Sequence, residues 1–247
     1  MVMAERRVAL VTGSATGIGR SAAWRFAELG YDVVVNYSKS REDAEQTADG
    51  VRSRGAGVLV IRADAGKDVE VRSLVESAAS AFGGLDVLVN NAATTHFIPH
   101  TDLDSVTDAV WDDILQLNVK GTFYSCRAAM PLLQHRNGSI VNVASVAGIA
   151  GSGSSIPYAA SKGAVITLTK SLARAFAPQV RVNAVAPGPV LTRWLADHQD
   201  MVDQAVSLTP LKRAATPDDI AEAIVYLADR ATLTTGQILV VDGGRTM

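Results

Sequence analysis

The sequence contains little cysteine and little histidine, which narrows the chemistry open to it. A single cysteine, Cys126, occurs among 247 residues, together with four histidines. One cysteine excludes an internal disulfide and any metal site built from several cysteines. Cys126 lies in a helical pattern over residues 123–133, where a small buried hydrophobe is favoured over a nucleophile. We therefore expect no bound metal.

Long apolar runs and an excess of charge of one sign are also lacking. No run approaches the roughly 20 apolar residues of a membrane helix. Residues 1–7 lead into an apolar strand without the longer apolar region and cleavage site of a signal peptide. The formal net charge of −2 disfavours a general nucleic-acid binder or a protein that binds acidic membranes. These features predict a cytoplasmic protein with neither kind of partner.

What the sequence does contain is an alternation of short apolar runs with helix-length segments. Hydrophobic residues make up 48% of the chain and charged residues 19%, which fits a globular protein with a large core. Strands joined by helix-length connections form right-handed crossovers, and hence a parallel sheet covered on both faces. We expect one α/β domain over residues 1–247, a doubly wound Rossmann fold of about seven strands. The expected strands are Val8–Val11, Val33–Asn36, Val58–Ile61, Leu85–Asn90, Ser139–Ser145, Val180–Ala186 and Ile238–Val241.

Helical patterns occupy the connections between these strands. Residues 94–105 are expected to form a loop with a short helix, and the small residues of 148–155 a loop. The expected helices are a segment ending near Leu29, Arg41–Arg54, Val69–Phe82, Trp111–Gln134, Ile156–Phe176 and one beginning at Pro217.

A glycine-rich loop follows the first strand. Gly13, Gly17 and Gly19 stand between that strand and the first helix, spaced G-x-x-x-G-x-G. Glycine lets the backbone approach a pyrophosphate, and the helix N-terminus offers free N–H groups. A tight strand-to-helix turn needs glycine in any case, so the position of the loop, more than its composition, favours a phosphate site.

Tyr158 and Lys162 are four residues apart, so they share one face of a helix. A nearby ammonium lowers the pKa of a phenol, which can then exchange a proton with a carbonyl or alcohol oxygen. Ser145, at the end of a strand, could donate a hydrogen bond to the same oxygen. Taken alone, the pair would be an exposed helix face and the serine a turn former.

In order along the chain, these motifs resemble the short-chain dehydrogenase/reductase family, and most of all its 3-oxoacyl-acyl-carrier-protein reductase branch. The resemblance covers essentially the whole sequence. It is carried by T-G-x-x-x-G-I-G at 12–19, N-N-A at 90–92, Asn118, Ser145, Tyr158-x-x-x-Lys162, Pro187-Gly188 and T-G-Q-x-x-x-V-D-G-G at 235–244.

The resemblance implies four catalytic residues. Tyr158 would be the general acid or base, and Lys162 would lower its pKa and bind the nicotinamide ribose. Ser145 would orient the substrate oxygen. Asn118 would hold a water of a proton relay, although alone it would be a polar residue on a mostly apolar helix.

The resemblance also implies a nicotinamide cofactor held along the edge of the sheet. Asp64 would contact adenine, although a helix cap is an equal alternative, and Asn90 would line the adenosine pocket. The full set of expected contacts is Gly13, Ser14, Thr16, Gly17, Ile18, Gly19, Asn36, Tyr37, Ser38, Asp64, Ala65, Asn90, Ala92, Tyr158, Lys162, Pro187, Gly188, Val190 and Thr192.

One position departs from the family. The usual N-N-A-G is N-N-A-A here, with Ala93 in place of glycine. Its β-carbon restricts the backbone angles and narrows the cleft near the cofactor. We expect a local adjustment without loss of binding.

The end of the second strand bears on the choice of cofactor. Enzymes that prefer NAD carry an acidic residue there, which accepts from the ribose hydroxyls. Residues 35–41 contain no carboxylate, while Ser38 and either Lys39 or Arg41 could receive a 2′-phosphate. This predicts that the cofactor is NADP(H), with NAD(H) as the alternative. The same polar residues would also form an ordinary solvated turn if they contacted no cofactor.

The expected activity is reduction of a carbonyl, with a 3-oxoacyl thioester as candidate substrate and residues 187–210 as a substrate lid. The alternatives are a dehydrogenase of a sugar, polyol or other secondary alcohol, and a catalytically silent NADP-binding sensor. An epimerase or dehydratase would need a longer chain with an added domain. The family also implies a homodimer or homotetramer, formed through Trp111–Gln134 and Ile156–Phe176.

Overall fold

The computed structural model describes residues 6–196 and 198–247, with the side chain of Met201 left out, so part of the expected 1–247 domain lies outside it. Seven strands form one sheet, and every neighbouring pair is parallel. The order across the sheet is β3-β2-β1-β4-β5-β6-β7. The strands are β1 Val8–Val11, β2 Asp32–Tyr37, β3 Val58–Arg62, β4 Val87–Asn90, β5 Ser139–Val143, β6 Arg181–Pro187 and β7 Ile238–Val241.

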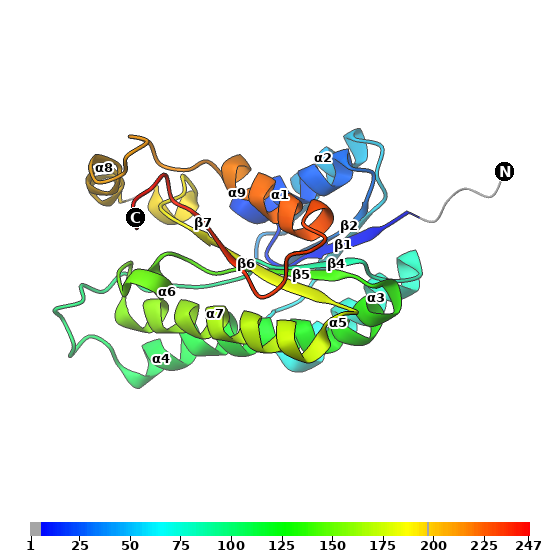
Figure 1. Ribbon diagram of the computed structural model, residues 1–247, viewed down its shortest axis with the longest axis horizontal. Helices are drawn as coiled ribbons and strands as arrows, with labels where there is room; N and C mark the ends of the chain where they lie inside the picture. The colour runs from blue at the N-terminus through cyan, green and yellow to red at the C-terminus, as the bar shows by residue number, and fades with distance from the viewer. Residues whose placement is uncertain (1–5, 197) are drawn as a thin grey trace.

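Helices cover both faces of the sheet (Figure 1). Helices α1, α2 and α9 lie on one face, and α3, α4, α5 and α7 on the other, which confirms the doubly wound Rossmann fold. The helices are α1 Gly17–Glu28, α2 Arg41–Ser53, α3 Asp68–Phe82, α4 Asp108–Leu115, α5 Thr122–Arg136, α6 Ala147–Ala150, α7 Ile156–Phe176, α8 Gln199–Ser207 and α9 Pro217–Val225, with shorter segments η1 Gln116–Gly121, η2 Arg193–Leu195 and η3 Tyr226–Arg230.

Burial on both faces explains why the central strands are continuous apolar runs. All four residues of β1 are buried, with Ala9 and Val11 in the core under α1 and α9. Val8 and Leu10 face the opposite core, which the helices α3, α5 and α7 cover. Alternation along the strand therefore supplies both cores from one run.

The strand order reverses direction between β1 and β4. The chain passes from β1 to β2 and β3 on one side, then crosses to β4 on the other side of β1. At such a switch point the loops leaving the two strands diverge, which opens a crevice at their carboxyl ends. The glycine loop after β1 and the N-N-A-A segment after β4 border this crevice.

The helix expected over Trp111–Gln134 is present as a continuous helical stretch, but it contains a wider π-helical turn that the sequence did not predict. Helix α4 ends at Leu115, the wider π-helical segment η1 follows, and α5 begins at Thr122. A side-chain bond from Thr122 Oγ1 to the Asn118 carbonyl, 2.8 Å long, accompanies the widened turn. Gly121 packs so closely that a β-carbon there would lie 2.6 Å from the Ala65 carbonyl oxygen. Insertions of this kind are frequent at functional sites.

The segments expected as loops also differ in detail. Residues 94–105 contain no helix, whereas 148–155 overlaps the short helix α6. The segment 187–210, expected as a substrate lid, contains η2 and α8. Within residues 6–196 and 198–247, no helix combines the length and apolarity needed to cross a membrane. The same residues contain no group of histidine, cysteine or carboxylate side chains placed to hold a metal ion.

Candidate active site

A cavity of about 630 Å³ opens at the carboxyl ends of the strands. Loops after β1, β2, β3, β4, β5 and β6 all contribute to its wall, together with α7 and the 187–210 segment. The residues expected from the sequence that line it are Gly13, Thr16, Gly17, Ile18, Asn36, Tyr37, Ser38, Asp64, Ala65, Ala92, Ser145, Tyr158, Lys162, Pro187, Gly188, Val190 and Thr192.

The glycine loop is shaped by contacts that leave no room for side chains. Gly13 and Gly17 have φ of +61° and +57°, a region that favours glycine. A β-carbon on Gly13 would lie 2.9 Å from Ala92 Cα, and one on Gly17 would lie 3.3 Å from Thr192 Cγ2. The loop therefore offers bare backbone to the cavity immediately before the N-terminus of α1.

Two residues expected at the cofactor support this loop from behind and do not line the cavity. The Ser14 hydroxyl donates to the Val11 carbonyl at 2.8 Å and accepts from the Asn36 amide at 3.0 Å. A β-carbon on Gly19 would lie 2.6 Å from Asn91 Nδ2. Both positions thus fix the path of the loop.

The adjacent asparagines after β4 point in opposite directions. Asn91 lines the cavity, and its amide group donates to the carbonyls of Thr12 and Gly13 at 3.0 and 2.9 Å. Asn90, expected at the adenosine pocket, is buried on the other side and donates to Asn142 Oδ1 at 2.9 Å. Successive side chains of an extended chain point to opposite sides, which explains why Asn91 lines the cavity and Asn90 does not.

Asn90 also donates to the sulfur of Cys126 at 3.2 Å. The cysteine is completely buried, and burial raises the pKa of its thiol to about 12. A thiol that stays protonated is a poor nucleophile. The predicted role of Cys126 as a small buried hydrophobe is confirmed.

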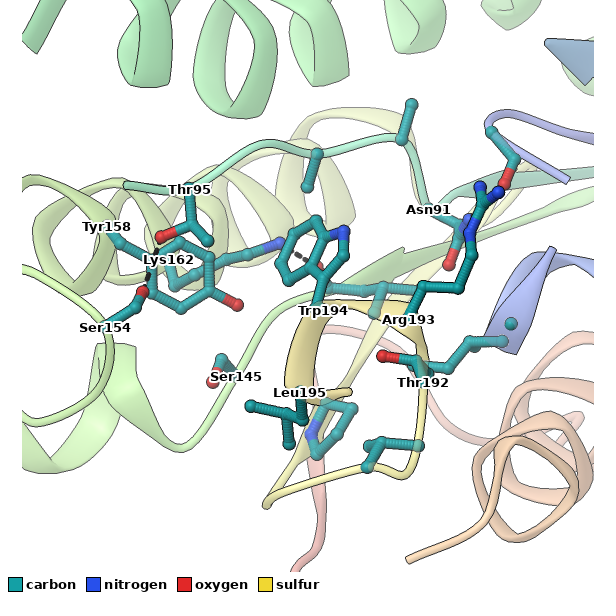
Figure 2. A pocket seen from close by; sticks show the side chains of 18 of the residues that line it. Asn91, Thr95, Ser145, Ser154, Tyr158, Lys162, Thr192, Arg193, Trp194 and Leu195 are labelled. Atoms are coloured by element: carbon teal, nitrogen blue, oxygen red, sulfur yellow. Dashed lines mark hydrogen bonds between the residues drawn. The ribbon is translucent and has the colours of Figure 1, made fainter. Parts of the chain in front are cut away.

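Helix α7 carries Tyr158 and Lys162 into the cavity. Its N-cap is Ser155, whose side chain accepts from the Tyr158 amide at 3.4 Å, and Pro157 occupies the first turn. Lys162 is 4% exposed, and its Nζ donates to the Val143 carbonyl of β5 at 2.7 Å. Figure 2 shows Ser145, Tyr158 and Lys162 on the same side of the cavity.

Burial is the main influence on the pKa values of both Tyr158 and Lys162. Burial raises the pKa of Tyr158 to about 12, and a hydrogen bond with Ser145 opposes that rise. The Lys162 ammonium is held by Val143, 5.7 Å from the centre of the tyrosine ring. Burial also lowers the pKa of Lys162 to about 8. Desolvation of both groups outweighs their coupling.

Asn118 does not line the cavity, but it connects two elements that do. Its Oδ1 accepts from the Thr94 amide at 2.8 Å, and its Nδ2 donates to the Thr94 carbonyl and Ser161 Oγ, each at 3.0 Å. The π-helical segment η1 places this side chain between the loop after β4 and helix α7. Asn118 therefore fixes α7 one residue before Lys162.

Ala93 lines the cavity, as the departure from the family pattern predicted. Its φ is not positive, so alanine is accommodated without backbone strain. The backbone at this position is therefore compatible with alanine, while the expected local adjustment and retained binding stay predictions.

Two aromatic side chains at the cavity make contacts that the sequence did not predict, one from the expected substrate lid (Trp194) and one from the loop after β4 (Phe97). Trp194 of η2 packs edge-to-face on Tyr158, with ring centres 6.3 Å apart (Figure 2). Phe97, in the loop after β4, stacks on His198 at 3.9 Å. These contacts link segments far apart in the sequence, and no local pattern could have paired them.

Comparison with known proteins gives matches over nearly the whole chain. A family model described as enoyl-(acyl carrier protein) reductase matches residues 13–246. The "granaticin polyketide synthase putative ketoacyl reductase 2" of Streptomyces violaceoruber is 49% identical over 97% of this chain and 96% of its own. The 3-oxoacyl-[acyl-carrier-protein] reductase FabG of Staphylococcus epidermidis is 40% identical over 97% and 98%.

A solved structure agrees with these relatives. The short-chain dehydrogenase/reductase "SDR:Glucose/ribitol dehydrogenase" from Brucella melitensis superposes with a TM-score of 0.90 and 33% identity, over 98% of each chain. The match extends over the seven-stranded parallel sheet and the helices on both of its faces. The chain therefore belongs to the short-chain dehydrogenase/reductase family and is an NAD(P)-dependent oxidoreductase.

Proposed function

We propose that the protein is an NADP(H)-dependent reductase that converts the ketone of a 3-oxoacyl thioester to a hydroxyl group. The observation that carries the proposal is the placement of Ser145, Tyr158 and Lys162 on the wall of one cavity that also contains the glycine loop. A proton donor, a hydrogen-bond donor and a phosphate-binding loop thus share one space.

The residues present fit a dinucleotide. Gly17 is the first residue of α1, and a β-carbon there would fill space beside the free N–H groups of the helix N-terminus, where a pyrophosphate is stabilised. Asp64 and Ala65 line the adenosine end of the cavity, and Thr192 and Pro187 line the nicotinamide end in this proposal. When bound, NADPH supplies the hydride.

The protein's own groups supply the proton. With its pKa near 12, Tyr158 stays protonated at neutral pH, which is the form that a general acid for carbonyl reduction requires. Ser145 donates a hydrogen bond to the same carbonyl oxygen and stabilises its developing negative charge. The cationic form of Lys162 favours the phenolate that remains after proton transfer.

The preference for NADPH follows from the end of β2. Ser38 and Lys39 are exposed and line the cavity, where a hydroxyl and an ammonium can receive a 2′-phosphate. We expect NADPH to bind more tightly than NADH, and Ser38→Asp to reverse this order by about tenfold, since a carboxylate repels the phosphate and accepts from ribose hydroxyls. Calorimetric titration of the unaltered protein and the variant with each nucleotide measures these affinities. Equal or tighter binding of NADH by the unaltered protein would contradict the preference.

The names of two relatives and the apolar part of the cavity support a thioester substrate. Val146, Trp194 and Leu195 line the cavity on the side of Ser145 and Tyr158 and suit an acyl chain. The test is the initial rate of NADPH oxidation with an acetoacetyl thioester, with NADH in parallel. Rapid turnover supports the proposal, whereas NADPH binding without turnover would overturn the thioester as substrate.

The Brucella melitensis neighbour is named a glucose/ribitol dehydrogenase, which favours a sugar or polyol as the second candidate substrate. The same assay distinguishes it when run with NADP⁺ and polyols in the oxidative direction. A catalytically silent sensor is the remaining candidate. It would bind NADPH and turn over neither substrate class, although it keeps Tyr158 and Lys162.

We also propose self-association through the outer faces of α4, α5 and α7. Phe123 on α5 is 40% exposed, and Arg127 lies over its ring at 5.4 Å. In such an assembly the second copy would cover this ring and the arginine above it. Light scattering at micromolar concentration is expected to give two or four times the mass of one chain. A monomer at that concentration would contradict the proposal.

A further inference from the structure

Arg193 reaches from the 187–210 segment to two elements on the other side of the cavity. Its Nη1 donates to Asp43 Oδ2 in the first turn of α2 at 2.9 Å, and its Nη2 donates to Thr16 Oγ1 in the glycine loop at 3.0 Å. Asp43 is itself held by Arg20 of α1, whose Nη2 lies 3.4 Å from Oδ1. Arg193 and Thr16 both line the cavity, so the arginine spans its phosphate-binding part.

The residues on either side of Arg193 contact the rest of the site. Thr192 packs against Gly17, and Trp194 packs on Tyr158. Figure 2 shows Arg193 and Trp194 extending in different directions from one short stretch of chain. Three consecutive side chains thus touch the glycine loop, helix α2 and the catalytic tyrosine.

The residues just before Arg193 are held by backbone hydrogen bonds to the segment that precedes α9. The Leu191 amide donates to the Ala215 carbonyl, and the Ala215 amide donates to the Pro189 carbonyl, each at 2.9 Å. After Leu191, the hydrogen bonds of the Arg193 guanidinium connect the chain to Asp43 of α2 and to Thr16. That ion pair is 62% exposed on the arginine side and 30% on the aspartate side, so water and salt can open it at low cost.

We propose that Arg193 is a cofactor-positioning residue: its ion pair with Asp43 straps residues 191–195 over a dinucleotide bound at the glycine loop and seats Trp194 on Tyr158. This inference depends on the proposed function, because it requires a dinucleotide bound at the glycine loop. An open strap admits the nucleotide, and a closed one slows its release and shields the reacting atoms from water. Because the closing contact is one ion pair between two distant segments, its two partners act as a unit.

The test is the rate of NADPH release, measured by stopped-flow fluorescence with an excess of unlabelled NADP⁺ and no carbonyl substrate. Arg193→Gln and Asp43→Asn are each expected to speed release about threefold, the size of one exposed ion pair. The double variant should release NADPH no faster than the faster single variant, because both changes open the same strap. Arg52→Gln, which removes the exposed ion pair to Asp49 further along α2, is the control and should leave release unchanged.

Two further measurements separate positioning from a structural role. Arg193→Lys should restore slow release only in part, since an ammonium lacks the planar fork that reaches Asp43 and Thr16 together. Thermal unfolding without nucleotide should be the same for all variants. The proposal would be overturned if Arg193→Gln sped NADPH release and Asp43→Asn did not, or if the effects of the two substitutions were additive in the double variant. Unchanged release in variants that bind NADPH would overturn it while leaving the cofactor proposal intact, and failure of the unaltered protein to bind NADPH or NADH would overturn both.

Discussion

Tyr158→Phe is expected to reduce turnover by about 10³-fold while leaving NADPH affinity within twofold, the former being typical of a lost general acid. The substitution removes only the hydroxyl, so the ring keeps its edge-to-face contact with Trp194. Without that hydroxyl, the carbonyl oxygen keeps the Ser145 hydrogen bond but has no proton donor. Initial rates at saturating NADPH, together with calorimetric titration of the nucleotide, measure the two quantities separately.

Tyr226→Phe provides the matched control for this change. Tyr226 begins η3, is 50% exposed and is not among the residues that line the cavity. Its substitution should leave both turnover and affinity unchanged. Turnover by Tyr158→Phe within tenfold of the unaltered protein would show that another group supplies the proton, and the role of Tyr158 would then have to be withdrawn.

Helix α7 shows how far local sequence determines the site. Its bounds, Ile156–Phe176, agree with the prediction because a serine N-cap and a proline in the first turn mark its start. Once the helix begins at Ile156, the spacing of Tyr158 and Lys162 places both side chains on the face toward β5. The strands were predictable to within two residues for a similar reason, since burial on both faces leaves continuous apolar runs.

Asn118 and the asparagine pair after β4 show where local sequence fails. The side of the chain on which Asn90 or Asn91 lies depends on how β4 ends against β1 and β5, which is a tertiary contact. The π-helical turn at Asn118 depends on the close approach of Gly121 to Ala65. Arg193 was missed because its partner Asp43 lies 150 residues earlier in the chain, and both read as ordinary surface charges.

The pKa values of Tyr158 and Lys162 could not be predicted from spacing either. The sequence indicated that Lys162 would stabilise a phenolate, yet burial affects each group more than they affect one another in the protein as described. The same burial means that Lys162 carries a cost in stability. A substitution at Lys162 should therefore change both the proposed catalytic step and the free energy of unfolding.

Lys162→Met should therefore lower activity and raise stability together. We expect turnover to fall by about 10²-fold, because no cation remains to favour the phenolate form of Tyr158. Methionine fills a similar volume without a buried charge, so the free energy of unfolding at pH 7 should rise by about 2 kcal/mol. Urea unfolding and initial rates measure the two effects. Lys170→Met, an exposed lysine of the same helix, is the control and should change neither.

The pH dependence of this stability difference identifies its cause. The pKa of Lys162 is about 8 in the folded protein and near its ordinary value of 10.5 when unfolded. Below pH 8 both states bind the proton and the cost is fully present; between pH 8 and 10.5 only the unfolded state keeps it, so the stability contributed by this group rises with pH. The raised pKa of Tyr158 acts only above pH 10, where the unfolded tyrosine begins to lose its proton. The advantage of Lys162→Met should accordingly shrink from pH 8 towards pH 10, and a constant advantage would show that packing, and not the buried ammonium, is responsible.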